Sequence, residues 1–248
     1  MLKVENLYVN YGNIEVLKGI SFHVEEGEMV CLLGTNGMGK STTLSAISGL
    51  VKPKAGSIFF YDSDITGLPT EKIIKLGISH IPEGRLIFPD LTVMEHLELG
   101  AYIYYSDRSR KDDFKQALEL VFNTFPTLKD KQKRTAKTLS GGEQQMLVIG
   151  RGLMSKPKLL IMDEITMGLA PILSREILMT VRSLTEQGLS ALLVEQNAHA
   201  ALKVATRGYV FVDGKIALEG TSKKLLSNQD MRAVYLGSRV STTPETPK

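Results

Sequence analysis

A glycine-rich segment at residues 34–41 constrains this chain more than any other part of its sequence. It reads GTNGMGKS and fits the pattern G-x-x-x-x-G-K-[ST]. In such a loop the glycines let successive backbone N–H groups point at a polyphosphate. Lys40 brings a compact positive charge to the β- and γ-phosphates, and the Ser41 hydroxyl can ligate Mg²⁺. The segment therefore predicts a phosphate-binding loop for a nucleoside triphosphate.

The residues on either side supply the setting that this motif requires. Residues 28–33 are a short apolar run of strand type, and residues 42–50 have a helical pattern. A strand, a glycine loop and a helix in that order favour phosphate binding over a glycine-rich turn with a chance lysine. The dipole of the helix N-terminus also favours anions. The predicted nucleotide-binding residues of this segment are Gly34, Asn36, Gly37, Gly39, Lys40, Ser41 and Thr42.

The composition indicates a soluble globular protein. The 248 residues are 43% apolar, and the net charge of +3 is too small to argue for nucleic-acid binding. The single cysteine, Cys31, excludes a disulfide framework. No apolar run approaches the roughly 18–20 residues of a membrane helix, and residues 1–5 lack a signal-peptide pattern. We expect an intracellular protein; if it acts at a membrane, other chains must span it.

Apolar periodicity divides the chain into strands and helices. Residues 2–11 and 16–24 are expected to form an antiparallel pair across a turn at residues 11–13. The further predicted strands are residues 28–33, 56–61, 77–81, 158–163, 190–194, 209–212 and 215–218. The predicted helices are residues 42–50, 69–76, 93–105, 112–125, 139–155, 171–187, 198–205, 222–226 and 230–236. This alternation predicts an α/β fold with a mainly parallel sheet, helices on both faces and an N-terminal antiparallel portion.

The segment 85–138 differs in character from the rest. It carries two predicted helices joined by a charged connector, and it ends in a basic stretch, residues 129–137, that we expect to be a solvated face or loop. We therefore expect a core of residues 1–84 and 139–236 with a helical subdomain at 85–138. The polar end of the chain, residues 237–248, is predicted to be a flexible tail.

Two adjacent acids follow a strongly apolar strand. The stretch 159–164 reads LLIMDE, so Asp163 and Glu164 emerge at the carboxyl end of a buried strand, where α/β sheets bind ligands. Asp163 is positioned to hold Mg²⁺, directly or through water. Glu164 can accept a proton from an attacking water. Alone the pair would be weak evidence, but downstream of a phosphate loop it favours catalysis over two chance acids at a turn.

A second helix start with anion-binding chemistry lies at residues 139–145, which read LSGGEQQ. Ser140 and Glu143 have the spacing of a capping box. Gly141 and Gly142 expose backbone N–H groups at the helix N-terminus, which makes a second anion site. One nucleotide already has its phosphate cradle at residues 34–41, so this second cradle calls for a further role.

LSGGEQQ, placed between the phosphate loop and LLIMDE, resembles the signature of ABC-type ATPases, and the resemblance covers the chain to about residue 236. In that family two cassettes face head to tail in a C₂ arrangement, and each signature closes on the nucleotide held by the other's phosphate loop. The resemblance implies the P-loop NTPase fold, ATP hydrolysis, and ATP and Mg²⁺ as cofactors. It places Ser140, Gly141 and Gly142 on the ATP of a second cassette.

The resemblance also assigns roles to single residues. Tyr11 matches the aromatic residue that stacks on adenine, although a tyrosine that only packs on the sheet would look the same. Glu83 stands where the family usually has a glutamine near Mg²⁺ and the membrane partner. Gln196 replaces a histidine that contacts the γ-phosphate in many members, and it can hydrogen-bond phosphate but not titrate. Residues 167–170 occupy the dimer-contact loop, and Ile165 replaces a usual proline.

Three short segments resemble one subgroup, the ATPases of branched-chain and hydrophobic amino-acid importers. They are PEGR at 82–85, IFP at 87–89 and VEQN at 194–197. This resemblance implies separate membrane permeases, a second cassette that is identical or paralogous, and an indirect link to a solute-binding protein. It places the chain in the cytoplasm, peripheral on the inner face of the cell membrane. The apolar run within 85–91 is expected to help form the groove for a permease helix.

Alternative functions remain open at this point. The chain could serve another transport system, for urea, amides or lipid export. A soluble ABC protein of the ribosome or of DNA repair usually has two cassettes or a long coiled coil, and neither is present here. A regulatory subunit without turnover is disfavoured by the intact Lys40, Asp163 and Glu164. The four histidines show no metal-ligand spacing, and neither they nor the methionines are assigned a function.

Overall fold

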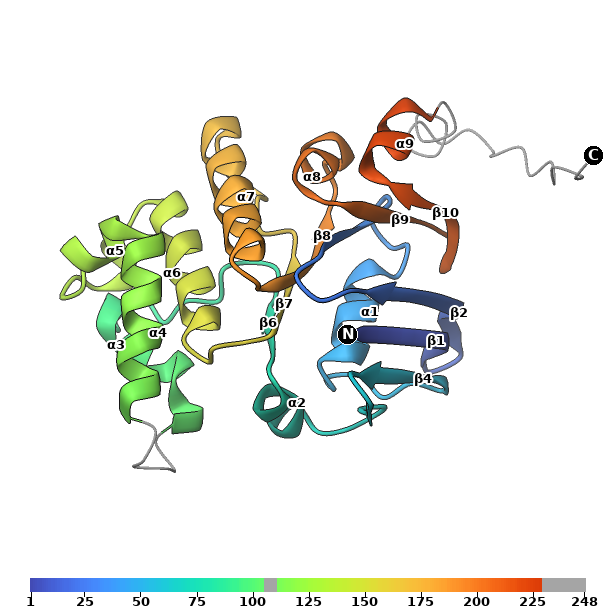
Figure 1. Cartoon of the computed structure of the whole chain (residues 1–248), viewed down its shortest axis with the longest axis horizontal. Helices are drawn as coiled ribbons and strands as arrows, with labels where there is room; N and C mark the ends of the chain where they lie inside the picture. The colour runs from blue at the N-terminus through green and yellow to red at the C-terminus, as the bar shows by residue number, and fades with distance from the viewer. Residues whose placement is uncertain (105–110, 229–248) are drawn as a thin grey trace, which may run out of the picture.

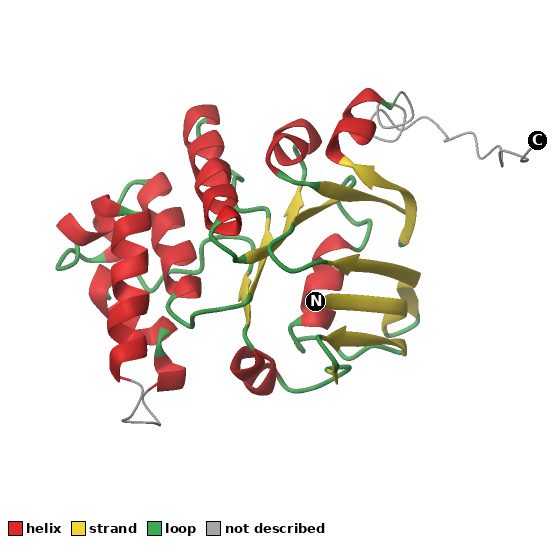
Figure 2. Ribbon diagram, in the orientation of Figure 1, coloured by secondary structure: helices red, strands yellow, loops and turns green. Residues whose placement is uncertain are grey.

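The computed structural model describes residues 1–104 and 111–228. These residues form two β-sheets with helices packed around them, and a group of helices stands at one end of the molecule (Figures 1 and 2). The predicted helix at 230–236 and the predicted tail at 237–248 lie outside the described residues. Within the described part of the chain, no helix is both long and apolar enough to cross a membrane.

The first sheet is antiparallel and has four strands in the order β2-β1-β4-β5. β1 (Leu2–Tyr11) pairs with β2 (Ile14–Val24), from Leu2 opposite Val24 to Tyr11 opposite Ile14. This pairing confirms the predicted early hairpin. β4 (Ala55–Phe60) pairs with the other edge of β1, and the short β5 (Ser63–Asp64) completes the sheet.

The second sheet has six strands in the order β10-β9-β3-β8-β7-β6. Its inner strands are mutually parallel, and β10 pairs antiparallel with β9 at one edge. This arrangement confirms the predicted mainly parallel sheet of an α/β fold. The strand bounds are β3 (Met29–Leu33), β6 (Ile78–Ile81), β7 (Leu159–Asp163), β8 (Ser190–Glu195), β9 (Arg207–Val212) and β10 (Lys215–Thr221).

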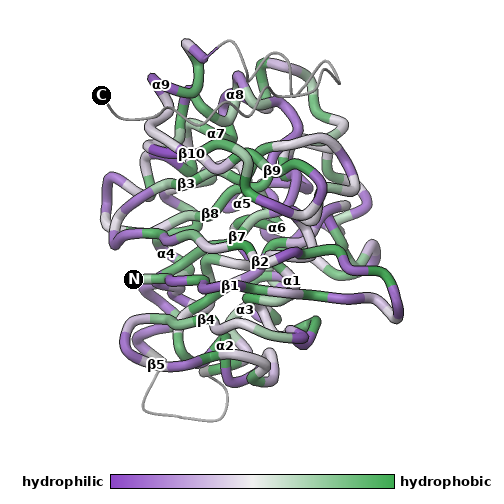
Figure 3. The backbone as a smooth tube through the Cα atoms, turned by 90° about the vertical axis from the view of Figure 1, so that its right-hand side faces the viewer, coloured by the Kyte–Doolittle hydropathy of each residue, from purple (hydrophilic) through white to green (hydrophobic). Residues whose placement is uncertain are grey.

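The parallel strands of the six-stranded sheet are almost entirely buried on both faces, which explains their apolar runs, whereas alternate residues of the edge strand β10 are exposed. On β3, Val30 and Leu32 belong to a core shared with the first sheet, whereas Cys31 and Leu33 belong to a core shared with the large helices. The apolar stretches of the central strands run through the middle of the molecule (Figure 3). Because these strands are parallel, their carboxyl ends lie at the same edge of the sheet, where the loops that follow them meet.

The helices fall into two groups around this sheet. α1 (Lys40–Ile47) packs between the two sheets, and α7 (Pro171–Glu186) and α8 (Ala198–Val204) cover the opposite face. α6 (Gly141–Leu153) packs on β6 and also on the helices at the end of the molecule (Figure 1). The remaining helices are α2 (Thr70–Leu76), α3 (Val93–Gly100), α4 (Lys111–Thr124), α5 (Pro126–Asp130) and α9 (Ser222–Ser227).

The prediction of one helix over residues 93–105 was wrong in its length. α3 ends at Gly100, and a separate 3₁₀ turn, η1, follows at Tyr102–Tyr104. Gly100 lets α3 pack tightly against α6, because a Cβ atom there would clash with the carbonyl oxygen of Arg151. The glycine that permits this contact also weakens the continuation of the helix.

The prediction of a solvated loop at residues 129–137 was also partly wrong. α5 extends to Asp130, and a 3₁₀ turn, η3, spans Ala136–Thr138. Leu128 and Ala136 are both buried in the core beneath these two turns. Pro126 occupies the first helical position, where it costs no hydrogen bond. These two buried residues were not recognised in the sequence because most residues around them are charged or polar.

Candidate functional site

The predicted phosphate loop lies between the end of β3 and the start of α1, as the motif requires. Gly39 directly precedes α1 with a φ of 96°, and a Cβ atom there would lie 2.5 Å from Leu17. Lys40 is buried, and its Nζ donates hydrogen bonds to the carbonyl oxygens of Gly34 (2.9 Å) and Thr35 (3.0 Å). The lysine is therefore held inside the curve of the loop, where phosphate oxygens can replace these two carbonyls.

An open cleft of about 410 Å³ lies over this loop. The structure brings Glu83 and Glu164 to the same cleft as the residues of the phosphate loop. The residues that line the cleft are Val16, Asn36, Gly37, Gly39, Lys40, Ser41, Thr42, Glu83 and Glu164. Two acids and one lysine therefore face the same space, although they come from segments far apart in the sequence.

Asp163 ends β7 beside Ser41. Its side chain is buried, and its Oδ1 atom has no hydrogen-bond partner in the protein. Burial raises the pKa of Asp163, and a hydrogen bond from Ser41 acts in the opposite direction. Glu164 and Glu83 also raise this pKa, because their negative charges are close. A buried carboxylate oxygen without a partner, next to a hydroxyl, fits a hard cation such as Mg²⁺.

The positive charge of Lys40 lies close to the negative charges of these acids. Burial lowers the pKa of Lys40, while the carboxylates of Glu164, Asp163 and Glu83 act against that shift. Within the described ranges, no three His, Cys, Asp or Glu side chains are placed to hold a metal by themselves. A cation at Ser41 and Asp163 would therefore take its other ligands from phosphate and water, which is how Mg²⁺ is usually held.

Glu164 occupies a strained turn directly after β7. Its φ is 45°, a value that few residues other than glycine adopt. The backbone is held there because the Glu164 N–H donates to the carbonyl oxygen of Val194 on β8 at 2.9 Å. The side chain is nearly buried and lies at the wall of the cleft. Strain of this kind, over-determined by neighbours, is frequent at functional sites.

The segment LSGGEQQ begins α6 with the predicted capping box. The Ser140 N–H donates to Glu143 Oε2 at 3.0 Å, and the Glu143 N–H donates to Ser140 Oγ at 3.4 Å. Ser140 is exposed, and none of Ser140, Gly141 and Gly142 lines the cleft over the phosphate loop. Their backbone N–H groups are therefore not presented to a nucleotide held by the same chain's loop.

Arg85 joins three segments near this helix start. Its φ of 60° and the φ of 34° at Leu86 make two consecutive strained residues. The guanidinium lies against Gly141, where a Cβ atom would be 3.1 Å from Nη1. Nη2 also donates to the carbonyl oxygen of Gly168 at 3.5 Å. The segment after Glu83 is thus in contact with both the signature and the loop after Glu164.

Besides Gly34, Asp163 and the three signature residues, Tyr11 and Gln196 also lie outside the lining of the cleft. Tyr11 stands at the end of β1 with 50% of its surface exposed. Gln196 follows β8 and is also exposed. An exposed ring at the end of β1 can still receive a base. Their roles in ATP binding stay predictions.

Sequence reasoning missed the neighbour of Gln196. Glu195 ends β8, is 3% exposed, and accepts hydrogen bonds from the backbone and hydroxyl of Thr166. Burial raises the pKa of Glu195 to about 7, with added repulsion from Glu164 and Asp163. The signal was present in the sequence, since Glu195, like Asp163, is an acid at the end of an apolar strand.

Comparison with known proteins agrees with this architecture. The family model described as ABC transporter matches residues 17–167, more than half of the chain. The chain is 44% identical over 237 residues to the high-affinity branched-chain amino acid transport ATP-binding protein BraG of Pseudomonas aeruginosa, covering 96% of this chain and 100% of BraG.

Solved structures show the same fold. The crystal structure of the ADP conformation of an ATP-binding cassette of an ABC transporter superposes with a TM-score of 0.85 at 28% identity, covering 96% of this chain and 99% of that one. The dimeric structure of a post-hydrolysis cassette bound to ADP and Pi superposes with a TM-score of 0.75 at 25% identity, covering 90% and 99%. The chain belongs to the ABC transporter ATP-binding family: it is a nucleotide-binding ATPase with the P-loop fold.

Proposed function

We propose that this chain is the ATP-hydrolysing subunit of an importer for branched-chain or other hydrophobic amino acids. The observation that carries ATP hydrolysis is the convergence of Lys40, Ser41 and Glu164 at one cleft, with Asp163 hydrogen-bonded to Ser41. The substrate class is supported by the full-length similarity to a branched-chain amino acid transport protein. It is also supported by the three segments at 82–85, 87–89 and 194–197.

The residues divide the work of hydrolysis among them. Lys40 exchanges its bonds to loop carbonyls for the β- and γ-phosphates of ATP. Ser41 and Asp163 would hold Mg²⁺, with Glu83 near it, and the bound ion would neutralise phosphate charge. Glu164 accepts the proton of the attacking water. Gln196 hydrogen-bonds the γ-phosphate and positions it, since an amide cannot titrate.

A second cassette completes each site in this proposal. Ser140, Gly141 and Gly142 lie outside their own chain's cleft and offer backbone N–H groups at the start of α6. A head-to-tail C₂ pair would bring them to the ATP on the partner's Lys40. The loop of residues 167–170 would lie along the same interface, and Met167 is exposed there. A related cassette is dimeric in a post-hydrolysis state bound to ADP and Pi.

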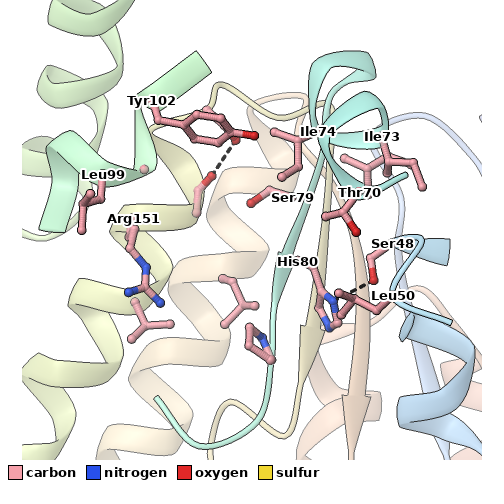
Figure 4. A pocket seen from close by; sticks show the side chains of 17 residues that line it. Ser48, Leu50, Thr70, Ile73, Ile74, Ser79, His80, Leu99, Tyr102 and Arg151 are labelled. Carbon is pink, nitrogen blue, oxygen red and sulfur yellow. Dashed lines mark hydrogen bonds between the residues drawn. The ribbon is translucent and has the colours of Figure 1, made fainter. Parts of the chain in front are cut away.

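A groove for a membrane partner lies on another side of the chain. It is a hollow of about 290 Å³ between α2 and β6 on one wall and α3, η1 and α6 on the other (Figure 4). Leu50, Leu99 and Tyr102 are exposed along it, with Arg151 and Ser79 between them (Figure 4). This mixture suits an amphipathic helix of a permease.

The run at 85–91, which we predicted to help form this groove, does not line it. It lies next to it, because Arg151 of the groove donates to the carbonyl oxygen of Leu86 at 3.0 Å. Leu86 and Phe88 are both more than half exposed. We propose that the groove and this run together bind the permease, at the inner face of the membrane, with residues 85–138 as a helical subdomain on the core.

The proposal is tested in two stages. The purified chain should release phosphate from Mg-ATP, and Lys40→Ala should abolish that activity while Lys72→Ala, an exposed lysine on α2, retains it. Deletion of the gene should then lower uptake of labelled leucine, and the wild-type gene but not the Lys40→Ala form should restore it. Phosphate release without any effect on leucine uptake would keep the ATPase and refute the substrate class.

A further inference from the structure

Glu195 and Thr166 form a contact that the hydrolysis scheme above does not use. Glu195 Oε1 accepts from the Thr166 backbone N–H at 3.1 Å, and Oε2 accepts from the Thr166 hydroxyl at 2.9 Å. Both oxygens of one buried carboxyl group are thus directed to one residue. Thr166 lies two positions after Glu164, in the loop that leads to residues 167–170.

The environment of Glu195 makes this contact costly to maintain. No cationic side chain in the described residues forms an ion pair with it, and the neighbouring charges of Glu164 and Asp163 are repulsive. Burying a carboxyl group without an opposite charge is unfavourable even when it is hydrogen-bonded. The other residues of β8, Ser190 to Val194, are small or apolar. An acid at this strand end therefore calls for a role other than packing.

The loop after Glu164 is attached to β8 at two points. Glu164, with a strained φ of 45°, donates its backbone N–H to Val194, and Thr166, two positions further on, is held by Glu195. Position 165 carries a buried isoleucine, whose φ no ring fixes. The backbone between Glu164 and Thr166 therefore retains conformational freedom in the unclamped state. The bidentate contact from β8 restricts it.

We propose that Glu195 is a positioning residue for ATP hydrolysis, which acts by clamping Thr166 and thereby fixing the Glu164 carboxylate and the loop after it. The proposal rests on the proposed role of Glu164 as general base. Glu195 does not line the cleft and does not touch the reacting atoms itself. A misplacement of about 1 Å at a reacting group can cost on the order of 100-fold in rate, so a clamp on this turn can affect turnover strongly.

Two pairs of variants, one at Glu195 and one at Thr166, separate loss of the contact from other effects of substitution. In Glu195→Gln, the amide oxygen can accept from the Thr166 N–H, while the amide N–H₂ donates to the Thr166 hydroxyl, which can accept as well as donate. The glutamine therefore keeps both contacts without the charge. Glu195→Ala removes both contacts. Thr166→Ser keeps the hydroxyl contact, and Thr166→Val removes it while preserving the shape of the side chain.

The experiment measures kcat and KM for Mg-ATP with the purified full chain. Glu195→Ala and Thr166→Val should lower kcat by roughly 10- to 100-fold, with KM changed by less than about threefold, since the phosphate loop is intact. Glu195→Gln and Thr166→Ser should retain kcat within about threefold of the wild type. A purely structural role would lower the melting temperature without this division between kcat and KM.

Each outcome decides for or against the clamp. Normal kcat in both Glu195→Ala and Thr166→Val would refute it. A Glu195→Gln variant as slow as Glu195→Ala would also refute it, because the charge rather than the contact would then matter. If Glu195→Ala fails to fold, Thr166→Val decides alone. Glu164→Gln is assayed in parallel: full activity in that variant overturns the proposed base itself, whereas a loss there with normal Glu195 variants overturns only the clamp.

Discussion

The Nδ1 atom of His80 lies 3.0 Å from the Ser48 hydroxyl oxygen, while the Nε2 atom of the same ring is buried without a hydrogen-bond partner. His80 is on β6 and is one of the residues that line the groove proposed for the permease (Figure 4). A proton added to the ring would place a positive charge next to apolar side chains. Burial accordingly lowers the pKa of His80 to about 4.

This pair predicts a dependence of stability on pH. In the unfolded chain the His80 pKa is near 6.5, whereas in the folded chain it is about 4. Between these two values the unfolded state binds a proton at His80 and the folded state does not. The stability that neutral His80 contributes is therefore fully present above pH 6.5 and is lost as the pH falls toward 4. At pH 5 the loss amounts to about 2 kcal/mol in the free energy of unfolding.

The matched variant for this prediction is His80→Asn, whose amide can still bond Ser48. Thermal unfolding at pH 7.5 and pH 5 should show a smaller drop in Tm for the variant than for the wild type. The difference should be roughly 4–8 °C, since 1 kcal/mol corresponds to about 2–4 °C in a chain of this size. Equal drops in the two proteins would show that His80 is already charged in the folded state.

A second prediction concerns the adenine base. Tyr11 is half exposed at the end of β1 and offers a ring face but no base-edge hydrogen bonds. Stacking is worth roughly 0.5–1.5 kcal/mol beyond burial, so Tyr11→Ala should raise the KM for ATP several-fold with kcat nearly unchanged. Tyr11→Phe keeps the ring and should behave as the wild type. An unchanged KM in Tyr11→Ala would remove this residue from the site.

A third prediction concerns the permease. The Phe88 side chain is 54% exposed; its ring lies tilted against the His96 ring, at 5.9 Å between centroids, and its backbone N–H donates to His96 Nε2 at 2.9 Å. Phe88→Asp should therefore leave the fold and the basal ATPase activity intact while it abolishes permease assembly or transport. Leu226→Asp changes a leucine on α9 that is 42% exposed and does not line the groove, and this variant should retain assembly and transport. Continued assembly and transport in Phe88→Asp would place the docking surface elsewhere.

Local patterns were sufficient to predict most of the fold. The strand, loop and helix around residues 34–41, the β1–β2 hairpin and the parallel sheet were all correctly predicted, because apolar periodicity and glycine spacing report local structure. The end of α3 was not, since it depends on how closely Gly100 approaches Arg151 of another helix. The turns near residues 129–137 were missed because two buried residues there are surrounded by charge.

Only the parts of the site that belong to sequence motifs could be predicted. Ser41 and Asp163 are adjacent in space, as the motifs suggest, and Glu83 reaches the same cleft. The contact of Arg85 with Gly141 joins segments more than fifty residues apart in the sequence, and no local pattern indicates it. The same is true of Glu195 and Thr166. Such pairs depend on the order of strands in the sheet, which sequence periodicity does not specify.

The last prediction concerns the catalytic dimer. Glu164→Gln keeps the shape and hydrogen-bonding reach of the side chain but removes its charge and basicity, and a general base contributes roughly 10²–10⁴-fold to rate. Hydrolysis should fall by a factor in that range while ATP binding persists. Uncleaved ATP would then remain between Lys40 of one chain and Ser140 of the other, so a stable dimer should elute from a sizing column with Mg-ATP.

A second substitution tests whether that dimer uses the signature. Ser140 is exposed at the first position of the capping box, so Ser140→Arg places a bulky cation there with little effect on the core. The double variant Glu164→Gln/Ser140→Arg should therefore elute as a monomer with Mg-ATP. Normal hydrolysis by Glu164→Gln would contradict its role as base. Slow hydrolysis without a dimer would instead indicate that the partner is a paralogous cassette, because the trans contact then requires a different chain.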